Sequence, residues 1–170
     1  MKKSLLLIAL FSLVLVNAQD IYLQCGNILD VSSGKTFVEK TIVVSANKIK
    51  SIENGYVTGS DPDTVIELKD KTVLPGLIDM HVHMESEFNP QSYIKRFTNN
   101  AADVAFESTL NAKKTLLAGF TTVRDLGGSG VNISLRNAIN KGVVDGPRIF
   151  TSGKALATPG GHADPTIGRK

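Results

Sequence analysis

Hydrophobic and polar residues alternate in short runs between residues 21 and 74, and turn-forming residues separate these runs. Such a pattern predicts β-strands joined by tight turns. Strands are expected over residues 21–29, 37–45, 49–52, 65–68 and 72–74, with turns at Ser32–Lys35 and Ala46–Lys48. We therefore expect a small N-terminal β-sandwich domain over residues 19–74.

From Leu77 onward the pattern changes to one of alternating strands and helices. A polar loop is expected over residues 85–90 and a helix over 101–117, where apolar residues recur every three or four positions up to Gly119. A strand over 120–124, a helix over 133–140 and a strand over 148–151 complete the series. This order predicts a parallel α/β sheet whose functional side chains gather at the carboxyl ends of its strands.

The first strand of this second region carries the strongest candidate chemistry. Strict alternation along residues 77–84 places Leu77, Asp79, His81 and His83 on one face of the strand. Two imidazoles at positions i and i+2 can bind one cation, so His81 and His83 are the candidate metal ligands, with the Asp79 carboxylate one step below them. The alternative is a buried strand whose histidines are only hydrogen-bonded.

Longer segments decide between these two interpretations. The stretches LPGLIDMHVH (74–83), AGFTTVRDLG (118–127), DGPRI (145–149) and ATPGGHADPT (157–166) resemble the amidohydrolase superfamily of metal-dependent hydrolases, in its imidazolonepropionase-like and Xaa-Pro dipeptidase (prolidase) branch. The resemblance covers nearly all of the chain after its first twenty residues.

The resemblance implies a TIM-like (β/α)8 barrel, and such a barrel needs about 250 residues. Only residues 77–170 are available for it, so about three barrel strands are expected over 75–170. The remaining metal ligands and the general base would lie beyond Lys170, and the chain alone should be inactive. We expect an N-terminal fragment, with a genuine short protein as the alternative.

Metal-assisted hydrolysis is the reaction that the resemblance implies. The substrate would be a small molecule or dipeptide, either Xaa-Pro or a cyclic amide, and a metal-activated water would cleave its C–N bond. Zinc is the metal expected for His81 and His83, as one or two ions, although iron, manganese or cobalt would suit the same ligands. A homo-oligomeric state of the full-length protein stays open.

Three further groups have two interpretations each. The adjacent Arg124 and Asp125 could position a substrate, but a structural ion pair is favoured. His162 follows two glycines and is the candidate substrate-binding residue, or a loop histidine without a role. The run Gly127–Gly130 could bind an anion through backbone N–H groups, but it lacks the complete motif of a nucleotide-binding loop.

Residues 1–18 have the features of a signal peptide. Lys2 and Lys3 precede an apolar run of about a dozen residues, too short for the roughly 20 that span a bilayer, and cleavage is expected after Ala18. A transmembrane anchor is the alternative, and export predicts a periplasmic or secreted protein without a stable membrane anchor.

Charge and cysteine content exclude other classes. The formal charge of +3 arises from 19 basic and 16 acidic residues, and removal of Lys2 and Lys3 leaves 17 against 16, a charge of +1. No basic cluster indicates nucleic-acid binding. Cys25 is the only cysteine, so no internal disulfide can form, and a small buried thiol is expected. A non-catalytic exported binding module and a nucleotide-binding protein remain as alternative functions.

Overall fold

A computed structural model of the chain describes residues 19–60, 62–161, 163 and 164. The chain divides into two compact units between Pro75 and Gly76. The predicted signal peptide, residues 1–18, lies outside the described residues, and so does His162.

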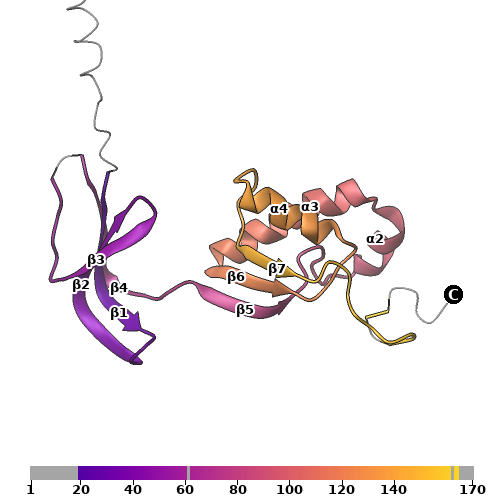
Figure 1. Cartoon of the computed structure of the whole chain (residues 1–170), viewed down its shortest axis with the longest axis horizontal. Helices are drawn as coiled ribbons and strands as arrows, with labels where there is room; N and C mark the ends of the chain where they lie inside the picture. Colours follow the sequence, from indigo (N-terminus) through magenta and orange to yellow (C-terminus); the bar gives the residue numbers. More distant parts are fainter. Residues whose placement is uncertain (1–18, 61, 162, 165–170) are drawn as a thin grey trace, which may run out of the picture. The chain divides into compact units, whose positions relative to one another are not determined.

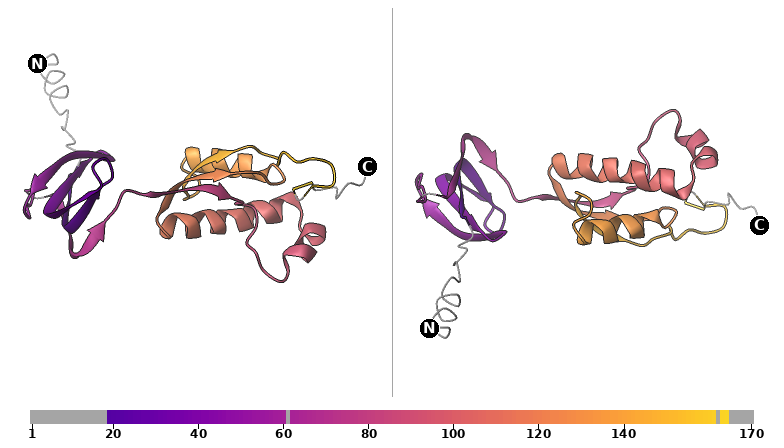
Figure 2. Two further views of the ribbon diagram at one scale, coloured as in Figure 1. Left: turned by 90° about the horizontal axis from the view of Figure 1, so that it is seen from below. Right: turned by 90° about the horizontal axis from the view of Figure 1, so that it is seen from above.

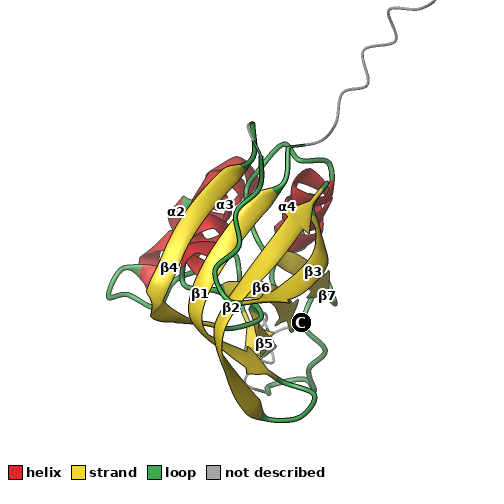
Figure 3. Ribbon diagram, turned by 90° about the vertical axis from the view of Figure 1, so that its left-hand side faces the viewer, coloured by secondary structure: helices red, strands yellow, loops and turns green. Residues whose placement is uncertain are grey.

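The first unit contains a four-stranded mixed sheet, drawn in yellow in Figure 3. Its strands are β1 (Ile21–Asp30), β2 (Lys35–Ser45), β3 (Lys48–Asn54) and β4 (Thr64–Val73), in the order β3-β2-β1-β4. β2 pairs antiparallel with β1 and β3, whereas β4 pairs parallel with β1. In place of the two layers of a sandwich, the described strands of this unit form one sheet.

Strand β4 is one continuous element where the sequence pattern predicts two short strands. The polar run Lys69–Lys71 interrupts the apolar pattern, but the backbone stays extended through it and bulges opposite Gly26. A Cβ atom at Gly26 would lie 2.1 Å from the carbonyl oxygen of Lys69, so only glycine fits here. The bulge explains why side-chain alternation alone splits the strand.

The core of the first unit is small and lies around β1. Cys25, Ile28 and Ile42 are its buried members, and Leu23, Val44 and Val73 pack against them. Cys25 is fully buried, as the sequence predicts, and burial raises the pKa of its thiol. A buried and protonated thiol packs as a small apolar group rather than acting as a nucleophile.

The second unit has the predicted parallel α/β arrangement. Its strands β5 (Leu77–Val82), β6 (Phe120–Asp125) and β7 (Arg148–Thr151) form a parallel sheet in that order. Helices α3 (Ala101–Leu117) and α4 (Val131–Asn140) contact each other and cover one face of this sheet (Figures 1 and 2). Ala112 and Leu135 from these helices pack against Val123, Ile149 and Met84. The first βα units of a barrel are thus confirmed.

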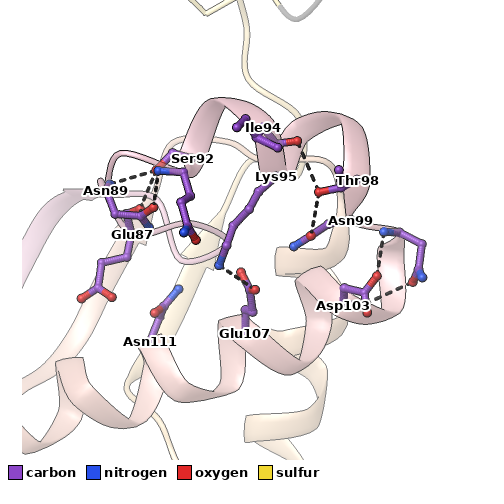
Figure 4. A network of polar contacts seen from close by, with 12 residues as sticks. Glu87, Asn89, Ser92, Ile94, Lys95, Thr98, Asn99, Asp103, Glu107 and Asn111 are labelled. Atoms are coloured by element: carbon purple, nitrogen blue, oxygen red, sulfur yellow. Dashed lines mark hydrogen bonds and ion pairs between the residues drawn. The ribbon is translucent and has the colours of Figure 1, made fainter.

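Helix α2 (Ser92–Thr98) is an element that the sequence analysis did not predict. It contains seven residues and buries none of them, so it gives only a weak periodic signal through Tyr93, Ile94 and Phe97. An ion pair of 2.8 Å between Lys95 and Glu107 joins it to α3 (Figure 4). Polar contacts of this kind between distant residues cannot be read from a local pattern.

Candidate metal site

The two candidate ligands lie where the first strand of the parallel sheet ends. His81 belongs to β5, and His83 follows it directly. Both side chains are exposed, and their ring centroids are 5.5 Å apart in an edge-to-face arrangement. The carboxyl ends of parallel strands are where α/β proteins place their functional groups.

An irregularity in β5 changes the predicted arrangement of faces. Asp79 is aligned with Val123 and Val82 with Asp125, so three steps along β5 match two along β6. Val123 and Asp125 are both buried on the helix-covered side. Asp79 therefore shares a face with Val82, and the prediction that it shares one with His81 and His83 is wrong.

Asp79 has a local partner instead of a place beside the imidazoles. Its Oδ1 accepts a hydrogen bond of 2.9 Å from the backbone N–H of His81. Alternation resumes beyond this point, with Val82 and Met84 packed in the core and both histidines exposed. Both imidazoles are thus exposed at the end of β5.

A backbone carbonyl fixes the ring of His83. Its Nδ1 lies 2.8 Å from the carbonyl oxygen of Gly127. A carbonyl oxygen can only accept, so Nδ1 carries the hydrogen and the lone pair of the neutral ring is on Nε2. Metal-binding histidines usually have this outer hydrogen bond, which orients the ring and makes Nε2 the ligand atom.

The separation of the two rings also suits a shared ion. With metal–nitrogen bonds of about 2.0–2.1 Å, and each nitrogen about 1.1 Å from its ring centre, two rings on one tetrahedral ion have centres about 5 to 5.5 Å apart. The observed 5.5 Å lies at the upper end of this range. Within the part of the chain that the structure describes, no group of three or more acidic, cysteine or histidine side chains could hold a metal.

The buried carboxylate of Asp125 ties three segments together. Its Oδ2 accepts from the backbone N–H of Met84 at 2.9 Å, and its Oδ1 accepts from the N–H of Gly127 at 2.9 Å and from Nδ2 of Asn132 at 3.0 Å. Asp125 is 1% exposed. This residue therefore connects the end of β5, the loop after β6 and the start of α4.

Arg124 and Asp125 do not form the ion pair that their adjacency suggested. The salt bridges found among the described residues include neither of them. Arg124 instead donates from Nε to the carbonyl oxygen of Met80 at 2.8 Å, at the irregularity in β5. Each residue contacts backbone rather than the other, so the favoured interpretation as an ion pair is wrong, and a role in substrate positioning stays a prediction.

A carboxylate of the chain itself binds the N–H groups of the glycine-rich loop after β6 and of the helix that follows. Glu85 accepts from the backbone N–H of Ser129 at 2.6 Å and from that of Asn132 at 2.8 Å, at the N-terminus of α4. The N–H of Gly128 donates to the carbonyl of Gly153. A carboxylate at this position satisfies free N–H groups and the helix dipole. The N–H groups of Ser129 and Asn132 are therefore already occupied, and the loop gives no support for nucleotide binding.

An open cavity of about 160 Å³ lies beside His83. Val82, Met84, Asn111 and Lys114 contribute to its lining, and Lys114 pairs with Glu87 at 2.8 Å. Pockets that enclose a drug-sized ligand measure roughly 300–1,000 Å³. This cavity is thus too small for a complete substrate pocket. The candidate substrate-binding residue His162 lies outside the described residues.

Comparisons with known proteins give matches over most of the chain. A model of the amidohydrolase family matches residues 72–169. Ochratoxinase from Aspergillus niger is 32% identical over 96 residues, which are 54% of this chain and 19% of that protein.

Two solved structures resemble both units. One is a Xaa-Pro dipeptidase with bound methionine, which is 42% identical with a TM-score of 0.80 over 89% of this chain and 37% of its own. The other is a prolidase complexed with N-methylphosphonate-L-proline, at 35% identity and a TM-score of 0.71 over 85% and 34%. The chain thus spans little more than a third of the solved relatives and a fifth of the curated one.

Proposed function

Because the chain belongs to the amidohydrolase family, we propose that the protein hydrolyses an amide or related C–N bond with the help of a divalent metal that His81 and His83 bind. The observation that carries this proposal is the hydrogen bond between Nδ1 of His83 and Gly127, which leaves Nε2 free beside the ring of His81. Nitrogen ligands of this kind favour zinc, and the family pattern allows one or two ions.

The bound metal would supply an activated water and polarise the scissile carbonyl. The described residues contribute the framework for it. His81 and His83 would hold the ion as neutral imidazoles, and the Gly127 carbonyl keeps the His83 ring in one orientation. Asp125 keeps the loop that carries this carbonyl in register with the end of β5.

An Xaa-Pro dipeptide is the proposed substrate, with a cyclic amide as the alternative within the same reaction class. The Xaa-Pro dipeptidase and prolidase structures support the dipeptide, since they are similar to this chain over both units. The sequence places His162 after Gly160 and Gly161, where a close backbone approach is easy, and we retain it as the candidate substrate contact.

Further residues would complete the barrel, the metal site and the general base. The coverage of 37% and 34% of the two solved relatives supports this proposal. So does the sheet of the second unit, whose uncovered face leaves Ile78 and Phe150 61% and 59% exposed. Large apolar side chains on a sheet face usually pack against another layer.

Export to the periplasm or out of the cell is proposed on the sequence of residues 1–18 alone. Among the described residues, no helix is long and apolar enough to cross a membrane. A periplasmic or secreted location suits an enzyme that acts on external peptides.

The proposal is tested by measuring bound metal in the full-length gene product by elemental analysis. We expect about one or two divalent ions per chain, and less than about a tenth of that content in the His81→Ala/His83→Ala double variant. Hydrolysis of Xaa-Pro dipeptides should be lost in parallel. His162→Ala is the matched control, because His162 is not one of the proposed ligands, and its removal should raise KM while metal content is kept.

A full-length protein that folds but binds no metal, or a double variant that keeps its metal, would contradict the proposed function. The exported binding module would then be the better account. Metal binding without turnover of dipeptides or cyclic amides would contradict only the substrate class.

A further inference from the structure

The last two residues of β6 hold the histidine segment at both of its ends. Arg124 donates from Nε to the carbonyl oxygen of Met80, the residue before His81. Asp125 accepts from the N–H of Met84, the residue after His83. Successive residues of a strand point to opposite faces, so this adjacent pair reaches the segment from both sides of the sheet.

The contact of Arg124 falls where β5 loses its regular pairing. A bulge adds a residue that the neighbouring strand cannot match, and it leaves a backbone group without its ladder partner. Arg124 supplies a side-chain donor at 2.8 Å in this place, between Asp79 and Val82. Because the bulge reverses the alternation of faces, it also determines that His81 points away from the helices.

The contact of Asp125 acts on the other histidine. The same carboxylate that accepts from Met84 also accepts from the N–H of Gly127, and the carbonyl of Gly127 orients the ring of His83. Asp125 is almost fully buried, so water does not compete for these hydrogen bonds. The position of His83 and the position of its outer hydrogen-bond partner thus depend on one group.

From these contacts we infer that Arg124 and Asp125 are positioning residues, which set the directions of the His81 and His83 imidazoles toward a shared divalent ion. This inference rests on the proposed function. Neither residue would be a ligand of the ion, because both are engaged with the backbone. Because the two residues are adjacent, they contact the residues on either side of the His81–His83 segment, Met80 and Met84.

Two substitutions of Arg124, to Gln and to Met, test the inference, because these two side chains have nearly the same shape. Gln carries a side-chain N–H at the same distance along the chain as Nε of arginine, whereas Met has the same length and no donor. Both remove the positive charge equally, and loss of a charge near a cation site should on its own tighten metal binding. Arg124 is exposed, so neither substitution leaves a cavity.

The probe is Co²⁺, titrated into the metal-free full-length protein against a competing chelator and followed by visible absorption. We expect Arg124→Gln to bind Co²⁺ at least as tightly as the wild type and with the same spectrum. Arg124→Met should bind Co²⁺ about tenfold more weakly and give an altered spectrum. A loss of affinity of this size is typical when a group outside the ligand shell of a metal is removed. Thermal unfolding of the metal-free variants should be alike, which separates positioning from loss of the fold.

Equal Co²⁺ affinity and spectra in Arg124→Met and Arg124→Gln would overturn the inference, whether both are as tight as the wild type or both weaker. The His81→Ala/His83→Ala variant is included to separate this result from failure of the proposed function. If wild-type Co²⁺ binding does not depend on these histidines, the proposed function fails, and the inference fails with it.

Discussion

The two units differ in what their most buried carboxylates contact. In the first unit the buried carboxylate of Asp20 pairs with the exposed Lys50, and the pair of Lys71 and Asp70 lies at the surface. In the second unit the carboxylates of Asp125 and Glu85 accept from backbone N–H groups of loops that are distant in sequence. Surface pairs contribute little to stability, whereas carboxylates bonded to backbone amides fix where a loop lies.

This difference indicates that the end of a strand that carries functional side chains needs hydrogen bonds to fix their direction. The apolar core of each unit is small, and hydrophobic packing does not specify the direction of a side chain at a strand end. The first sheet is determined by the pairing of β1 with its neighbours. The histidine segment has one neighbouring strand among the described residues, β6, and it relies on side-chain anchors from that strand.

The largest effect that this comparison predicts is on stability. Asp125→Ala leaves buried donors of Met84, Gly127 and Asn132 without their acceptor, and should lower the free energy of unfolding by about 3–5 kcal/mol. Asp30→Ala is the matched control, because Asp30 also accepts three hydrogen bonds, from Ser32 and Ser33, but in an exposed turn. Its loss should be much smaller, since water replaces the carboxylate. Urea unfolding followed by circular dichroism measures both, and equal losses would contradict the comparison.

A smaller effect is expected from pH in the first unit. The hydrogen bond from Lys50, followed by one from Ser45, lowers the pKa of Asp20 below its ordinary value near 3.8. A carboxyl with a lowered folded-state pKa stabilises the fold above its unfolded pKa, and this stability is lost as pH falls through the folded value. Carbon-detected NMR titration should therefore give a midpoint for Asp20 below that of a free aspartate.

Substitution of Lys50 sharpens this prediction. Lys50→Met removes the main cause and should raise the titration midpoint of Asp20, whereas Lys48→Met, at the start of the same strand, should leave it unchanged. An Asp20 midpoint that is the same in the wild type and in Lys50→Met would show that the ion pair of 2.8 Å does not persist in solution.

Elements with local signals were predictable from the sequence. Helix α3 runs from Ala101 to Leu117 as expected, because Asn100 and Asp103 form a capping box and Gly119 has the positive φ that ends a helix. Strand β7 likewise has its predicted bounds. Helix α2 and the continuous strand β4 were missed, since one depends on a contact with α3 and the other on a bulge opposite Gly26.

The candidate site was only partly predictable for the same reason. The pattern identified His81 and His83, but the bulge that separates Asp79 from them depends on pairing with β6. The sequence left open whether the glycine loop binds an anion through its N–H groups, and the structure shows the carboxylate of Glu85 there, 44 residues away from Ser129. Local periodicity contains no information on such distant partners.

The most direct test of the account is a crystal structure of the full-length protein with Co²⁺ bound, with the ion located by its anomalous scattering. The account predicts one ion within bonding distance of Nε2 of His83 and of the His81 ring, with Nδ1 of His83 still on the Gly127 carbonyl. A structure without a stoichiometric ion at these two imidazoles, or with the ion bound through Nδ1 of His83, would contradict it.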